Sequence, residues 1–170
     1  NFHFFENLFL SDEDIKIRLF SGKILERNFN THDGLISLLK FTLLNINSIQ
    51  LKIFSITLLH SLEELEAFRS IKFFIETLLK RNVKISEESL PRSFTFNWEN
   101  PKNRGQILEV CINLTLYDHY KNELSYNVTL DNGFIILLNC EGHNLKKIHK
   151  IPEVKHLHHL EYLNLSNCNI

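Results

Sequence analysis

His156 to Ile170 read H-L-H-H-L-E-Y-L-N-L-S-N-C-N-I, and the spacing of the apolar residues in this stretch decides the fold. The regularly spaced positions are Leu157, Leu160, Leu163, Leu165, Cys168 and Ile170. Leu163 and Leu165 alternate with polar residues, which predicts a short strand with both leucines pointing inward. Cys168 then supplies a small buried polar group that can join a ladder along stacked turns, and Ile170 closes the turn.

The same pattern occurs 25 residues earlier in the chain. The equivalents of Leu160, Leu163, Leu165, Cys168 and Ile170 are Ile135, Leu138, Cys140, His143 and Leu145. This length and this pattern resemble the leucine-rich repeat, in which each turn contributes one short strand to a stacked solenoid. The resemblance implies that the two segments are neighbouring turns with a shared interior.

The residues between the inward positions are the candidate functional surface. In stacked repeats they project from an extended concave face that suits protein partners. We therefore predict a partner-binding face formed by Leu137, Asn139, Glu141, Tyr162, Asn164 and Ser166.

The pattern runs to the last residue of the chain, and the sequence contains no Met. A solenoid turn cannot bury its own apolar face, so at least three turns are normally needed. We therefore expect this chain to be a fragment of a longer protein.

Composition places the chain among soluble globular proteins. The apolar residues make up 44% and the charged residues 23%, and the net charge of -1 argues against a nucleic-acid binder. There is no apolar run long enough for a transmembrane helix. The three Cys, two of them on repeat positions, indicate reduced thiols in the cytoplasm.

Helices are expected before the repeats. Apolar residues at helical spacing predict helices from Thr31 or Asp33 to Leu44, from Ser48 onward, and from Ser61 to Arg81. The short links between them predict antiparallel packing. Ahead of these helices, Ile15 to Phe20 alternate with polar residues and end at a Ser-Gly pair, which predicts a short strand.

The middle of the chain alternates with a period of two. Phe94 to Trp98, Leu108 to Leu116 and Leu124 to Leu130 predict strands, the last two as a β-hairpin, and Asp131-Asn132-Gly133 predicts a turn. The fold class is therefore α+β: antiparallel helices, a β-hairpin segment, then the first turns of a solenoid. The predicted segments are 1–22 (strand or linker, the end of an upstream domain), 23–83 (helices), 84–131 (β segment or cap) and 132–170 (repeats).

The sequence contains no catalytic or cofactor-binding motif, so no catalytic, cofactor or metal residue is predicted. Five of the nine His lie near Cys140 and Cys168, as a zinc site would require. The repeat register instead places His156, His158 and His159 on the outside, and we interpret them as surface residues. Three glycosylation sequons, at Asn113, Asn127 and Asn164, are interpreted as chance in an Asn-rich chain.

The helices and repeats together resemble the C-terminal part of the Rab geranylgeranyltransferase alpha subunit. Leu38 to Leu79 look like a prenyltransferase helical pair, and Ile15 to Phe20 like the end of a strand from an immunoglobulin-like insert. Leu114 to Ile170 are similar in spacing to the path from a helix with tyrosines, here Tyr117 and Tyr120, into the first repeats. The chain departs from the family in its helices, which lack Pro and Trp near the start of each pair, and in Leu108 to Leu116, which alternate like a strand where the family has a helix.

The resemblance implies a subunit that, with a beta subunit, attaches geranylgeranyl groups to Rab proteins. In that family the zinc and lipid sites belong mainly to the beta subunit, and the alpha residues near the reaction lie in earlier helical repeats that this chain lacks, so no catalytic residue carries over. The alternative is a non-catalytic cytoplasmic adaptor that binds proteins through its repeats. An extracellular repeat receptor is a third hypothesis, which glycosylation of Asn113 or Asn127 would favour.

Overall fold

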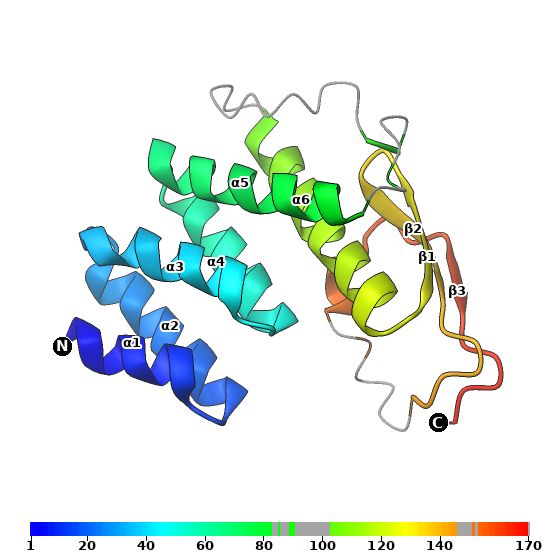
Figure 1. The fold of residues 1–170 in the computed structure, drawn as a ribbon, viewed down its shortest axis with the longest axis horizontal. Coiled ribbons are helices and arrows are strands. Elements are labelled where there is room, and N and C mark those ends of the chain that lie inside the picture. The colour runs from blue at the N-terminus through cyan, green and yellow to red at the C-terminus, as the bar shows by residue number, and fades with distance from the viewer. Residues whose placement is uncertain (83–84, 86–88, 91–102, 146–150, 152, 170) are drawn as a thin grey trace. The chain divides into compact units, whose positions relative to one another are not determined.

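The computed structural model describes residues 1–82, 85, 89–90, 103–145, 151 and 153–169 (Figure 1). It is an α+β fold with six α-helices and one three-stranded sheet in this part of the chain. The chain divides into two compact units, residues 1–74 and 75–170, and the boundary falls within one helix. The predicted strand from Phe94 to Trp98 lies outside the described residues.

The first unit is helical. Its elements are α1 (Phe2–Ser11), α2 (Ile15–Phe29), α3 (Asp33–Asn45), α4 (Ile49–Ser61) and the start of α5 (Leu65–Arg81). Side chains begin the helices as expected for N-caps: Asp14 accepts from the N–H of Lys16, and Ser48 from that of Leu51. The three helices predicted between Thr31 and Arg81 are thereby confirmed as α3, α4 and α5.

The strand predicted from Ile15 to Phe20 is wrong, because these residues form the first turns of α2. The alternating Ile15 and Ile17 are not buried; the buried residues of α2 are Ser21, Gly22 and Leu25, at helical spacing. Gly22 lies inside the helix and not in a turn. A Cβ atom there would lie 2.7 Å from the Phe54 ring, so the missing side chain permits close packing against α4.

Ser55 is a buried polar residue of α4 whose hydroxyl has no hydrogen-bond partner among the described residues. We expect Ser55→Ala to raise the free energy of unfolding by about 0.5–1 kcal/mol, because it removes an unsatisfied hydroxyl and improves helix propensity. Ser70→Ala is the matched control, since Ser70 is equally buried but donates to the Glu66 carbonyl. Urea titration of both variants tests this; a loss of stability in Ser55→Ala would reveal a partner for the hydroxyl.

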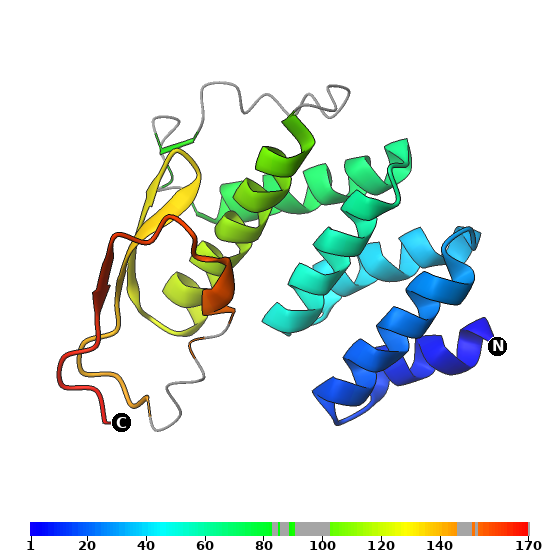
Figure 2. The same ribbon diagram turned by 180° about the vertical axis from the view of Figure 1, so that it is seen from behind.

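The second unit places a helix against the sheet (Figures 1 and 2). After the end of α5 come α6 (Arg104–Asp118), the π-helical turn η3 (His119–Glu123), β1 (Asn127–Asp131), β2 (Phe134–Asn139), the 3-10 turn η5 (Val154–His156) and β3 (Tyr162–Asn164). The strand order is β1-β2-β3, antiparallel between β1 and β2 and parallel between β2 and β3. The turn predicted at Asp131-Asn132-Gly133 joins β1 to β2, and φ is positive at Asn132 and Gly133.

The predicted strand from Leu108 to Leu116 is wrong, and so is the hairpin that included it, because these residues lie in α6. The polar residues between the apolar positions of α6 are buried too, so the alternation of polar and apolar residues does not distinguish a strand from a helix here. Thr115 donates to the Cys111 carbonyl and Asn113 to the Glu109 carbonyl, so both side-chain donors bond to carbonyls one turn earlier in α6. Segment 84–131 is thus largely helical where described, with β1 as its strand.

A buried carboxylate joins the end of α5 to the end of α6. Asp118 is 3% exposed. The Arg81 guanidinium donates to both carboxylate oxygens of Asp118, and Asn82 Nδ2 and Asn122 Nδ2 donate to Oδ1 at 2.8 and 2.9 Å. Asn122 Nδ2 also donates to Asn82 Oδ1 at 2.9 Å, so the carboxylate lies in a closed network.

Candidate functional site

The two repeat segments pair in the register that the sequence spacing predicts. Leu138 is opposite Leu163 and Asn139 is opposite Asn164, each pair 25 positions apart. Parallel strands have evenly spaced hydrogen bonds, and here Cys140 N–H donates to the Asn164 carbonyl at 2.9 Å. The segments are therefore adjacent, parallel and in phase.

The turns that follow the two strands are built from the same hydrogen bonds. Asn139 Oδ1 accepts from the N–H of Glu141 at 2.9 Å, and Asn164 Oδ1 accepts from that of Ser166 at 2.9 Å. The residues with positive φ, Gly142 and Asn167, are also 25 positions apart. Such side-chain turns on Asn fix the chain direction after a strand, and Gly and Asn are the residues that tolerate positive φ best.

A third pair of bonds completes the equivalence. His143 N–H donates to the Cys140 carbonyl at 3.1 Å, and Cys168 N–H to the Leu165 carbonyl at 3.3 Å. The Cys168 thiol reaches back to the Cys140 carbonyl at 2.9 Å, which links the turns as the sequence pattern predicts. The predicted closure by Ile170 lies outside the described residues.

Burial of the inward positions differs between the two segments. Ile135, Leu138 and Cys140 are fully buried, and Asn113 Oδ1 of α6 accepts from the N–H of Ile135 at 3.0 Å. Leu163, at the position equivalent to Leu138, is 43% exposed, so its predicted burial is wrong. Leu163 lies on β3, which is an edge strand, and no described strand pairs with the free edge of β3.

A β-bulge accounts for the inward position of both Ile135 and Leu138. Leu130 is opposite Ile135 and Thr129 is opposite Leu137, so Ile136 has no partner on β1. The extra residue reverses the alternation of side chains between the two faces. Leu137 and Asn139 consequently point to the face of the sheet away from α6, which we call the outer face.

The six predicted partner-binding residues occupy the outer face and the turns that follow it. Tyr162 is 51% exposed, Glu141 and Ser166 are exposed, and the others are half-buried. The sequence pattern did not indicate the contact between the two turns: Asn164 Nδ2 and Asn167 Nδ2 donate to the two Glu141 carboxylate oxygens at 3.3 and 3.5 Å.

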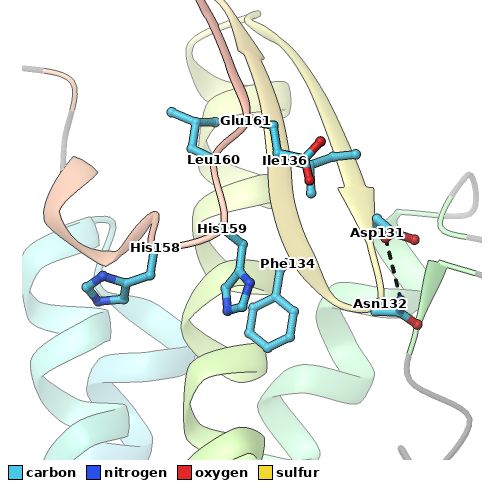
Figure 3. Close-up of a pocket in the computed structure, with 8 residues that line it drawn as sticks. All are labelled: Asp131, Asn132, Phe134, Ile136, His158, His159, Leu160 and Glu161. Atoms are coloured by element: carbon cyan, nitrogen blue, oxygen red, sulfur yellow. Dashed lines mark hydrogen bonds between the residues drawn. The ribbon is translucent and has the colours of Figure 1, made fainter.

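A pocket lies beside the hairpin turn (Figure 3). The turn residues Asp131 and Asn132 line it together with Phe134 and the His158–Glu161 segment. The His159 ring packs over Phe134 with ring centroids 4.0 Å apart, and His158 and His159 are exposed. The described residues bring no three His, Cys, Asp or Glu side chains together as metal ligands.

Because two thiols are buried, the stability of the fold depends on pH in the alkaline range. Burial, with a smaller effect from Cys168, raises the pKa of Cys140 from 9.0 to about 11. Between these values the unfolded chain loses a proton that the folded chain keeps, so stability falls as pH rises from about 9 to about 11. Burial also raises the pKa values of Cys111 and Tyr120, which act in the same direction.

We expect the urea midpoint to fall across this range, and less steeply in Cys140→Ala. The measurement is a urea titration by circular dichroism at several pH values under reducing conditions. Equal slopes in both proteins would mean that the Cys140 thiol ionises as readily in the folded state as in the unfolded state.

Comparison of the chain with protein-family models, curated proteins and solved structures finds no match. In the described part of the chain, no helix combines the length and the apolar composition that crossing a bilayer requires.

Proposed function

We propose that residues 135–145 and 160–169 belong to consecutive turns of a leucine-rich-repeat solenoid and that the protein binds a partner protein through the outer face of its sheet. The observation that carries the proposal is the recurrence of one hydrogen-bonded turn at an interval of 25 residues, from Asn139 and from Asn164. Stacked identical turns present side chains in rows, and such surfaces serve recognition of other proteins.

The proposal is tested by site-specific photocrosslinking in cell extract. Benzoylphenylalanine replaces Leu137 or Tyr162 on the outer face, or Phe41 as the control, since Phe41 is an aromatic residue of similar exposure on α3. We expect both outer-face sites to capture the same partner, identified by mass spectrometry, and the control site not to capture it. Adducts at Phe41 alone would contradict the proposal.

A second candidate function is that of a Rab geranylgeranyltransferase alpha subunit. Residues 108–116 are helical, as the resemblance to that family implies, and Tyr117 and Tyr120 are buried at the end of that helix and just after it. The helix over residues 15–20 argues against it, because the family resemblance implies a strand there. Copurification with a prenyltransferase beta subunit is the expected result for this candidate, and failure to bind would leave the adaptor function.

The cytoplasm is the proposed location for either function. Cys111 and Cys140 are buried free thiols, and Cys168 is a third thiol, half-buried. The Asn113 sequon is buried in α6, where its amide oxygen accepts from Ile135, so this site has no room for a glycan.

A further inference from the structure

The outer face carries three kinds of chemistry in rows that cross the strands. The strand register pairs Leu137 with Tyr162 and Asn139 with Asn164, and the next outward positions are Glu141 and Ser166. An apolar row is thus followed by an amide row and then by a row with a carboxylate and a hydroxyl. The first two rows lie on β2 and β3, and the third lies in the turns that follow these strands.

The apolar row offers a contact for a large side chain. Tyr162 is 51% exposed, and Leu137 beside it is half-buried. An exposed tyrosine next to an aliphatic residue presents a rigid apolar surface with little side-chain entropy to lose on binding.

The amide row has both of its side-chain oxygens engaged in hydrogen bonds. The Oδ1 atoms of Asn139 and Asn164 each accept from a backbone N–H in their own turn. Of the two Nδ2 groups, that of Asn164 donates to Glu141, while Asn139 offers amide hydrogens to a backbone carbonyl of a ligand.

Glu141 is the one formal charge among the six outer-face residues. Its contacts to Asn164 and Asn167 are long, at 3.3 and 3.5 Å, and both donors are neutral. These contacts hold the carboxylate in position yet leave it exposed, with acceptor capacity for a charge-assisted bond from a cation.

We infer that the outer face binds an extended segment of a partner protein that carries a large apolar residue and, further along, an arginine or lysine. The apolar side chain packs on Leu137 and Tyr162, a backbone carbonyl accepts from Asn139, and the cation pairs with Glu141. This inference rests on the proposed use of the outer face for protein binding.

The experiment is selection of random linear dodecapeptides displayed on phage against the immobilised chain, followed by fluorescence titration of the enriched peptides. We expect enrichment of peptides that carry a large apolar residue together with Arg or Lys. Glu141→Gln should weaken the selected peptide by about 3- to 10-fold at low salt and less at high salt, because an exposed ion pair is worth little more than that. The exposed Glu26→Gln on α2 is the matched control and should leave affinity unchanged.

The outcomes separate this inference from the function on which it rests. Peptides that lose affinity in Tyr162→Ala but show no basic bias, and that ignore Glu141→Gln, would overturn the inference and leave the binding face intact. Selection of no peptide that depends on Tyr162, together with no crosslinking from that position, would overturn both. Selection of acidic peptides by Glu141→Lys would support the assigned role of the carboxylate.

Discussion

Replacing Leu138 with alanine is expected to lower the free energy of unfolding by about 3 kcal/mol, whereas Leu163→Ala is expected to lower it by less than about 1 kcal/mol. The two leucines occupy equivalent positions in successive turns, yet Leu138 is fully buried and Leu163 is 43% exposed. Truncation of a buried leucine loses transfer free energy and leaves a cavity, while truncation at the uncovered edge leaves no enclosed void.

The comparison is made by urea titration of the two variants and the parent, followed by far-ultraviolet circular dichroism. Leu163→Asp extends the test, because a charge at a half-exposed site remains hydrated and should cost far less than Leu138→Asp. Equal losses for the two alanine variants would mean that Leu163 is covered in solution.

Removing the buried carboxylate should have an effect of similar size. We expect Asp118→Ala to lower the free energy of unfolding by about 3 kcal/mol, because it leaves Asn82 and Asn122 without their shared acceptor and Arg81 without its partner. The value lies at the lower end for a broken buried pair, since the Arg81 side chain is 54% exposed and regains water.

Two further variants sharpen the Asp118 experiment. Asp118→Asn keeps one acceptor oxygen but places an amide before Arg81, so an intermediate loss is expected. Asp131→Ala removes an exposed carboxylate and should change stability by less than about 0.5 kcal/mol. An Asp118→Ala protein as stable as the Asp131→Ala control would show that the network contributes nothing net.

Most of what could be predicted about the sheet came from the spacing between the two repeat segments. Leu138 and Leu163 pair as their 25-residue separation requires, because parallel strands in neighbouring turns keep a constant offset. The Ser48 cap likewise marked the start of α4. The opening helix α1 and the exposure of Leu163 were not predicted. Burial depends on which neighbour covers a position, and a periodic pattern does not contain that information.

Alternation failed as a strand signal where polar residues were buried. In α6, Asn113 and Thr115 sit between leucines and bond to carbonyls of their own helix, so a period of two coexists with burial on all sides. In α2, the alternation covers only three apolar positions, and the Asp14 side chain instead caps the first turn of a helix. The Arg81–Asp118 pair joins residues 37 positions apart, and no local pattern reveals such a pair.

The sequence predicted which residues lie together on the outer face, but not the hydrogen bonds among them and their neighbours. The six outer-face residues follow from the alternation within each turn, and the structure brings them together. The support of Glu141 by Asn167 was not foreseen, because it crosses from one turn to the next through side chains alone. The bulge at Ile136 was equally hidden, since four consecutive apolar residues give no sign of which one lacks a partner.

The antiparallel direction of β1 determines which edge of β2 can accept a parallel strand. β1 occupies one edge of β2 in the opposite direction, so a parallel turn can join only on the side where β3 lies. The ribosome delivers the β1–β2 hairpin first, and a hairpin forms within microseconds, long before the residues of β3 are synthesised. β3 therefore meets a template that already exists when its residues are made.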